Sequence, residues 1–232
     1  CTDRGYKTDI LLEAGLIKRS DRDHSLYDTF RHRIMFPIYS RTGNVIGFSG
    51  RYIGAKDYPK YLNTGETPLY SKSKEIFGLF HALRQIATTE TAVLVEGNPD
   101  VVRLHEIGVN TAIAPLGTAL TADQISIIKK YARTVILIGD TDDAGVKAVK
   151  KHGVDLLRNG LNVRVMILPE GKDPDEYFRL HHQDYEDCLT RCTFDYIPWI
   201  CHERMKEQQS QTEIAAVITE ICQLLALVQD QT

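Results

Sequence analysis

Residues 134–145 constrain this chain most, because a run of β-branched and aliphatic residues there ends abruptly in acids. The run 134–138 is typical of a strand buried on both faces, as in parallel sheets. Ligands of open α/β sheets bind at the carboxyl ends of such strands. Asp140 and Asp142 are two residues apart, so extended backbone would place both carboxylates on one side. A hard cation such as Mg²⁺, which prefers oxygen ligands, would relieve their repulsion.

A simpler explanation is that these acids only cap the next helix, where negative charge is favourable. Capping needs one acid, whereas Asp140, Asp142 and Asp143 supply three. We therefore favour the metal hypothesis.

A second acid, Glu96, follows another short apolar run at 92–95. It lies in a tight turn at a predicted strand end, where packing explains a carboxylate poorly. Asn98 before Pro99 predicts a helix start with Asn98 as the N-cap. Asp100 falls in the first turn of that helix, and interaction with the helix dipole is sufficient to explain it.

Strands and helices alternate from about residue 85. The predicted order is strand 92–95, helix 99–107, strand 111–114, helix 121–131, strand 134–138, helix 143–158 and strand 162–167. This series predicts an α/β fold with a four-stranded parallel sheet and right-handed crossovers. Thr121 is expected to cap the second helix. Asp173 and Asp175 follow the last strand, so a third acidic group would reach the same end of the sheet.

The preceding part of the chain is basic. Residues 34–39 and 45–52 are expected to form an antiparallel hairpin. Between residues 31 and 84 there are nine basic and three acidic residues, although the whole chain carries a net charge of −3. Basic groups interleaved with tyrosines are typical of grooves for single-stranded nucleic acid. The alternative is an ordinary solvated surface whose long side chains cover the sheet.

From residue 185 the pattern predicts two helices, at 185–208 and 212–229. One grouping resembles zinc ligands: Cys188, Cys192, Cys201 and His202. It contains no CxxC pair, so we expect cysteines buried in helices and no zinc. Five cysteines at irregular spacings also argue against a disulfide framework and suit a reducing cytoplasm.

The composition is that of an ordinary globular chain of one or two domains, with 43% hydrophobic and 25% charged residues over 232 positions. No apolar stretch approaches the roughly 20 residues of a membrane span, and no signal-peptide pattern is present. Because the sequence starts at Cys1 without Met, we expect an excised fragment.

Acidic strand ends in the order Glu, Asp-x-Asp, Asp-x-Asp resemble the topoisomerase–primase (TOPRIM) fold. The flanking sequence is similar to the replicative type of bacterial DNA primase, over roughly residues 26 to 180. The segments that carry the similarity are 30–38, 47–51, 59–64, 70–79 and 116–119. The resemblance implies a basic α+β subdomain at 1–84, a TOPRIM domain at 85–184 and a helical segment at 185–232.

Carried over residue by residue, the resemblance implies three sets of functional residues. The ligands of Mg²⁺ or Mn²⁺ would be Glu96, Asp140 and Asp142, with Asp173 and Asp175 assisting. Template or primer would contact Arg51, Lys60, Tyr61, Asn63 and Lys72, and nucleotide phosphates would contact Arg31 and Arg33. The family usually has glycine at Thr141 and an aromatic and an apolar residue at Asn98 and Pro99. These departures leave the branch of the family open.

The implied activity is that of a DNA-dependent RNA polymerase that makes short RNA primers on single-stranded DNA. A 3′-hydroxyl would attack the α-phosphate of a ribonucleoside triphosphate with metal assistance. The implied partners are template, primer, nucleotides and, through a domain outside this sequence, the replicative helicase. The implied location is the cytoplasm, at the nucleoid.

Three other functions remain open at this point. A phosphatase of the haloacid-dehalogenase type also carries Asp-x-Asp after a parallel strand, but after the first strand rather than the third. A TOPRIM nuclease or topoisomerase is closer, although no nucleophilic tyrosine stands out. A fragment that binds single-stranded DNA without catalysis is the non-enzymatic alternative.

Overall fold

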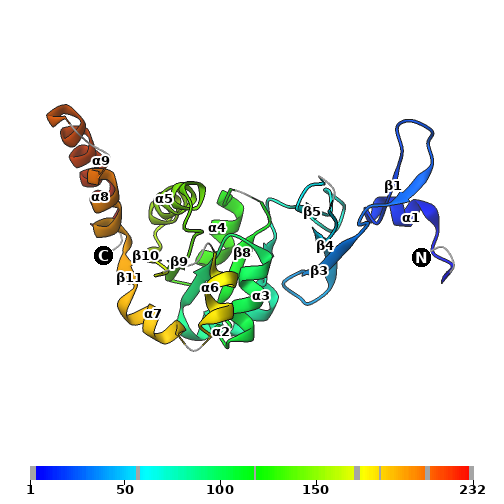
Figure 1. Ribbon diagram of the computed structural model, residues 1–232, viewed down its shortest axis with the longest axis horizontal. Coiled ribbons are helices and arrows are strands. Elements are labelled where there is room, and N and C mark those ends of the chain that lie inside the picture. Colours follow the sequence, from blue (N-terminus) through cyan, green and yellow to red (C-terminus); the bar gives the residue numbers. More distant parts are fainter. Residues whose placement is uncertain are drawn as a thin grey trace.

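The computed structural model describes residues 4–55, 58–117, 119–169, 173–182, 184–206 and 210–229. Three regions follow one another along its long axis: small antiparallel sheets, a central sheet covered by helices, and a C-terminal pair of helices (Figure 1).

The N-terminal region contains two antiparallel sheets. The helix α1 (Thr8–Glu13) precedes a pair formed by β1 (Ile17–Arg19) and β2 (Leu26–Asp28). A larger sheet follows, with β4 (Val45–Tyr52) between β3 (Arg33–Tyr39) and β5 (Tyr61–Asn63). The structure thus contains the hairpin predicted at 34–39 and 45–52. We call residues 31–75, which contain this larger sheet and the turn after it, the basic lobe.

The central sheet has the order β11-β10-β9-β7-β8-β6. Its strands are β6 (Ile76–Phe77), β7 (Thr91–Leu94), β8 (Ala112–Pro115), β9 (Thr134–Leu137), β10 (Asn162–Met166) and β11 (Thr193–Asp195). The four inner strands are parallel, as predicted, and the two outer strands run antiparallel to their neighbours. The antiparallel strands at the two edges were not predicted.

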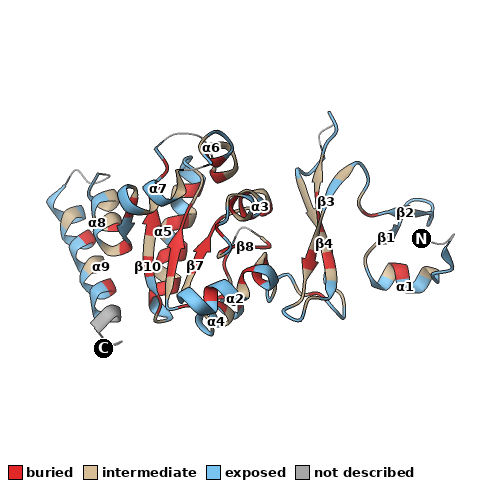
Figure 2. Ribbon diagram, turned by 90° about the horizontal axis from the view of Figure 1, so that it is seen from below, coloured by how far each residue is buried: buried red, intermediate tan, exposed pale blue. Residues whose placement is uncertain are grey.

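Helices cover both faces of this sheet, because alternate residues of each inner strand point to opposite sides. Leu94 and Leu137 face a core with α2 (Leu79–Thr89), α4 (Ala122–Lys129) and α5 (Asp143–Arg158). Val93 and Ile136 face a second core with α3 (Asn98–Glu106), α6 (Pro174–Leu180) and α7 (Tyr185–Arg191). Burial is concentrated in these strands, whereas α1, β1 and β2 are mostly exposed (Figure 2).

The helix predicted at 185–208 is interrupted, so that prediction is wrong over residues 193–195. There the chain forms β11, which pairs antiparallel with β10, and Arg164 Nε lies 3.7 Å from Asp195 Oδ1. The helical signal on both sides belongs to α7 and α8 (Tyr196–Lys206), and α9 (Gln211–Gln229) follows. In the part of the chain that the structure describes, no helix is long and apolar enough to cross a membrane.

Strand order determines where a ligand can bind. β7 lies between β8 and β9, so the chain leaves it first to one side and then crosses to the other. In open α/β sheets the crevice at such a reversal is the usual ligand site. Leu94 of β7 stands opposite Leu137 of β9, and Ile138 N donates to Leu94 O at 3.0 Å. The residues after these two strands therefore meet at the reversal.

The contact between α5 and α8 leaves no space at Gly153. A Cβ added there would lie 1.9 Å from Tyr196 Cε2, and the Tyr196 hydroxyl donates to Lys150 O in the same helix. This contact joins the C-terminal helices to the central domain.

We expect Gly153→Ala to lower the free energy of unfolding by about 1–3 kcal/mol, because the added methyl group overpacks this contact. In an exposed helix the same change would stabilise the protein by about 1 kcal/mol, so the sign is diagnostic. Gly65→Ala is the control, since nothing lies within 4 Å of its added Cβ. Urea unfolding followed by circular dichroism measures both, and a G153A protein as stable as wild type would contradict the packing described here.

Candidate metal centre and nucleic-acid groove

Glu96 and Asp140 meet where β7 and β9 end. Glu96 Oε1 accepts a hydrogen bond from the backbone N of Asp140 at 2.9 Å. Glycine is required close by, because a Cβ on Gly145 would lie 2.3 Å from Asp140 O. Burial raises the pKa of Glu96, and the negative charge of Asp142 raises it further. The two strand ends thus bring the carboxylate of Glu96 against the backbone of Asp140, and the charge of Glu96 acts on the Asp140 carboxylate.

Asp140 is the most crowded of these acids. Burial raises its pKa to about 7, and neighbouring carboxylates add to the shift in the order Glu96, Asp173 and Asp142. Lys60 of the basic lobe acts in the opposite direction. Within the described residues, the buried Oδ1 of Asp140 accepts no hydrogen bond. An unpartnered carboxylate oxygen among like charges fits a hard cation, so the residues present suit Mg²⁺ or Mn²⁺.

The remaining predicted ligands are engaged by protein donors. Asp142 caps α5 and Asp173 caps α6, each accepting a backbone N–H from the first helical turn, at 2.8 and 2.7 Å. Asp175 Oδ1 accepts from Arg103 Nε at 3.0 Å. In the described part of the chain, no three or more acidic, histidine or cysteine side chains lie together in a group that could hold a metal ion. We call Glu96, Asp140, Asp142 and Asp173 the acidic rim.

Asp100 belongs to the same neighbourhood, although the sequence suggested only a helix-dipole role. Its side chain is 6% exposed, and its two oxygens accept the backbone N–H groups of Gly97 and Asp175 at 3.0 and 3.1 Å. Burial raises its pKa to about 7, and the charges of Asp173 and Asp140 contribute. Asp100 therefore ties the Glu96 turn to the start of α6. The available signal was its position four residues after Glu96, in the first turn of α3.

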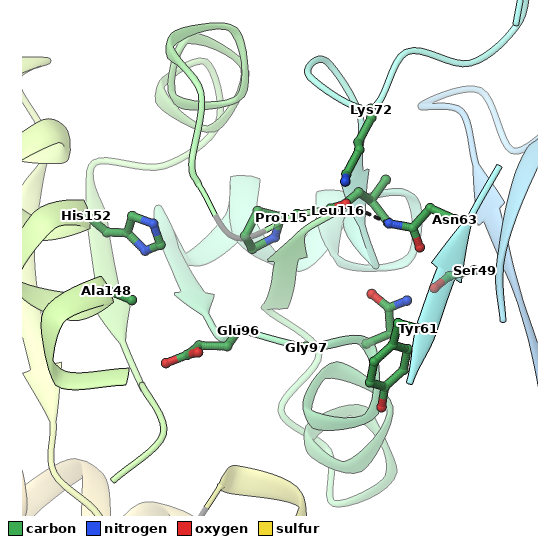
Figure 3. A pocket seen from close by; sticks show the side chains of 12 residues that line it. Ser49, Tyr61, Asn63, Lys72, Glu96, Gly97, Pro115, Leu116, Ala148 and His152 are labelled. Atoms are coloured by element: carbon green, nitrogen blue, oxygen red, sulfur yellow. Dashed lines mark hydrogen bonds between the residues drawn. The ribbon is translucent and has the colours of Figure 1, made fainter. Parts of the chain in front are cut away.

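A pocket of about 330 Å³ opens beside Glu96 and takes its walls from both parts of the molecule. We call it the Glu96 pocket. The basic lobe contributes Tyr61, Asn63 and Lys72, which lie opposite Glu96 in Figure 3. Asn98 also lines it, and the prediction that this residue is the N-cap of α3 is wrong. Gly97 occupies that position and Asn98 begins the helix, because Asp100 binds the N–H of Gly97.

The basic side chains of the lobe lie close to the acidic rim. Burial raises the pKa of Tyr61, the charge of Arg51 lowers it, and Asp100, Asp173 and Asp175 raise it. Lys60 Nζ lies 5.9 Å from the centre of the Tyr61 ring. This juxtaposition of positive and negative walls was expected from the charge pattern of the sequence.

Asn63 has a more local role than its predicted one. Its side-chain nitrogen donates to Leu116 O at 2.7 Å and thereby joins β5 to the loop after β8 (Figure 3). Its amide nitrogen is engaged by the protein.

Arg31 and Arg33 line a different pocket, of about 610 Å³, together with Tyr27, Tyr52 and Tyr58. We call it the tyrosine pocket. The guanidinium of Arg31 lies 4.8 Å from the Tyr27 ring centre, and that of Arg33 lies 5.5 Å from Tyr52. Arg33 also donates to two backbone carbonyls at 2.9 Å each. The structure therefore separates these arginines from the residues that line the Glu96 pocket.

Comparison with known proteins identifies both parts of the chain. Residues 1–83 match the N-terminal domain of the DNA primase catalytic core, and residues 93–178 match the Toprim-like family. A solved DNA primase domain from Pseudomonas aeruginosa is 33% identical with a TM-score of 0.85, covering 95% of this chain and 70% of that one. The chain belongs to the bacterial DNA primase family. The haloacid-dehalogenase alternative is therefore wrong.

Two further relatives define the extent of the similarity. A DnaG primase catalytic domain solved with single-stranded DNA is 33% identical with a TM-score of 0.84, covering 98% of this chain and 73% of that one. The DNA primase of Staphylococcus aureus (strain COL) is 41% identical over 182 residues. That match covers 78% of this chain and 30% of the relative, so the chain spans about a third of the relative's length. Toprim domains and primases are metal-dependent, generally on Mg²⁺.

The cysteines of the C-terminal region are placed in different surroundings. Cys188 is buried in the core and its thiol donates to the Tyr177 hydroxyl, whereas Cys192 and Cys201 are partly exposed. The expectation of buried helix cysteines therefore fits Cys188 best.

Crowding at the acidic rim predicts a pH-dependent stability. Asp140 has a folded-state pKa of about 7, above the unfolded value of about 3.9. The metal-free protein should therefore lose free energy of unfolding as pH rises from about 4 to 7. Asp140→Asn removes this loss, so without metal it should melt at a higher temperature than wild type at pH 8 and at a similar one at pH 4.

Melting temperatures in EDTA and in Mg²⁺ test this. Mg²⁺ should raise the melting temperature of wild type more than that of D140N. Asp187→Asn, at an exposed carboxylate that pairs with Arg191, is the control and should follow wild type in both series. A D140N protein that melts below wild type at pH 8 in EDTA would show that the carboxylates do not repel one another.

Proposed function

We propose that this chain is the catalytic core of a primase, which synthesises short RNA primers on single-stranded DNA for replication. The observation that carries this proposal is the Glu96 pocket, where the carboxylate of Glu96 faces Lys72 and Tyr61 of the basic lobe and is hydrogen-bonded to the backbone N of Asp140. Membership of the primase family supports the same conclusion. In the reaction, a 3′-oxygen bonds to the α-phosphorus of a ribonucleoside triphosphate, pyrophosphate leaves, and the hydroxyl proton is released.

Glu96 and Asp140 are the proposed metal ligands, together with Asp142. Bound Mg²⁺ or Mn²⁺ would lower the pKa of the attacking hydroxyl and stabilise charge on the phosphates. Asp142 caps α5 through Oδ1, so its other carboxylate oxygen would bind the cation. Asp173 assists from the same rim, since its charge already acts on Asp140. The main role that we assign to Asp175 is structural: its carboxylate binds Arg103, and its backbone N–H binds Asp100. Assistance to the metal is its secondary role.

The basic lobe would hold template and primer. Arg51 and Lys60 attract phosphates, and Tyr61 offers a ring on which a base can stack. Asn63 fixes the wall of the groove and leaves its amide oxygen for the nucleic acid. Lys72 contacts a phosphate in the Glu96 pocket. The solved relative that binds single-stranded DNA supports this assignment.

Arg31 and Arg33 were expected at nucleotide phosphates. Because they line the tyrosine pocket with three aromatic rings, we propose that they hold single-stranded DNA there and leave the triphosphate to the Glu96 pocket. The whole protein would meet the replicative helicase through a domain beyond this sequence and would work at the nucleoid in the cytoplasm.

We also propose a refined domain division. Residue 84 lies inside α2, and β6 pairs with β8, so the first boundary should fall before Ile76 rather than after residue 84. The division between the TOPRIM and helical parts at residue 184 matches the start of α7, although β11 returns to the sheet.

Loss of a proposed ligand should abolish catalysis without unfolding the chain. We expect Glu96→Gln and Asp140→Asn each to lower template-dependent dinucleotide synthesis by about 100-fold or more, the scale of removing one preorganised charged group. The assay uses radiolabelled ribonucleotides, Mg²⁺ and a single-stranded template. Wild-type rates from both variants would overturn the proposal, whereas an inactive wild-type chain that still binds template would identify a binding fragment.

Phosphate contacts in the basic lobe should be visible in the salt dependence of binding. We expect Arg51→Ala and Lys60→Ala each to reduce the slope of log K against log salt by about 0.7, the value for one contact to a single strand. Fluorescence anisotropy of a labelled oligonucleotide between low and moderate salt measures the slope. Arg191→Ala, on the exposed face of α7, is the control and should leave the slope unchanged.

A further inference from the structure

We propose that Gln124 is a positioning residue, which fixes the turn carrying Lys72 and so holds the lysine ammonium group in the Glu96 pocket. The inference rests on the proposed function, in which Lys72 contacts a phosphate. The phosphate belongs either to a nucleoside triphosphate or to the nucleic-acid backbone, because both present the same chemistry to an ammonium group.

Gln124 is a buried polar residue whose amide is committed to backbone groups. Its side chain, at the start of α4, is 1% exposed. Nε2 donates to the carbonyl oxygens of Glu75 at 2.8 Å and Lys72 at 3.3 Å, while Oε1 accepts from Thr121 N at 3.0 Å. A buried amide loses free energy unless it is hydrogen-bonded. The bond from Thr121 N orients the amide at the start of α4, and the two bonds from Nε2 hold the turn against α4.

The turn is also held from two other sides. Thr121 Oγ1 donates to Ser73 O, and Lys72 N donates to Glu66 Oε1 at 2.8 Å. The backbone of Lys72 is therefore fixed at both its N–H and its carbonyl group. The bonds from Thr121 and Gln124 join a turn of the basic lobe to the start of α4 in the central domain, some fifty residues later in the chain.

This arrangement places the Lys72 side chain over the loop after β8. A Cβ built on Gly117 would lie 2.9 Å from Lys72 Cε and 3.3 Å from Nζ, so the stem crosses the glycine closely. Asn63 holds the same loop through Leu116 O, and Figure 3 shows Lys72 directed toward this segment. The Lys72 side chain is thus partly ordered before the ligand binds. Binding then costs less conformational entropy, which favours affinity.

A cycle of four proteins tests the inference: wild type, Gln124→Met, Lys72→Ala and the double variant. Methionine keeps the volume of glutamine and removes the hydrogen bonds. Two probes separate the phosphate sources: Mg-ATP and a 12-nucleotide single-stranded DNA. For whichever probe K72A weakens, we expect Q124M to weaken binding by about threefold to tenfold in the Lys72 background, and by less than about twofold in the K72A background.

Equal weakening by Q124M in both backgrounds would overturn the inference, because the effect would then not pass through Lys72. If K72A changes the affinity of neither probe, the proposed role of Lys72 fails instead, and the two failures are distinguishable. Gln85→Met, at an exposed position on α2, controls for the substitution itself. Should Q124M fail to fold by circular dichroism, Thr121→Val, which removes the bond to Ser73 O, replaces it with the same expectations.

Discussion

The backbone hydrogen bonds between β7 and β9 determine the geometry of the whole site. These strands pair in parallel at the point where the order of the sheet reverses, so both chains emerge into one crevice. Glu96 follows one strand and Asp140 the other, and neither can move away without breaking the pairing. The buried aliphatic residues on both faces make that pairing costly to disturb. A hydrophobic sheet therefore forces two like charges together.

Backbone N–H groups stabilise the carboxylates of the other acids near the site. Asp142 and Asp173 satisfy helix N-termini, and Asp100 satisfies two backbone amides. Asp140 Oδ1 is buried and, within the described residues, accepts no hydrogen bond. Capping and metal binding are thus not exclusive explanations of an acidic strand end. A carboxylate has two oxygens, so a side chain that caps a helix with one still presents the other.

Sequence reasoning was successful where the signal is local and periodic. The parallel strands, the hairpin of the basic lobe and the cap at Thr121 all follow from patterns within a few residues. It failed at β11, where pairing with β10 overrides a helical pattern, and at β6, whose two residues are too short to show alternation. The roles of Asp100 and Gln124 depend on partners far away in the chain, and no spacing rule reveals such partners.

The same limit applies to Arg31 and Arg33. The family resemblance assigned them to nucleotide phosphates, apart from the residues expected at template or primer, and their position depends on how β3 pairs with β4. Only the folded sheet separates the tyrosine pocket from the Glu96 pocket. The charge pattern predicts a nucleic-acid ligand, and the fold divides the basic surface into two pockets.

The antiparallel strands β6 and β11 have a consequence for assembly. They are the edge strands of the central sheet, and they are short: β6 has two residues and β11 has three. Each edge therefore presents few unpaired peptide groups to another chain. Extension of the sheet by a neighbouring molecule is therefore disfavoured. Partners of this domain must instead recognise its helices and loops, which leaves the order of the strands undisturbed when larger complexes form.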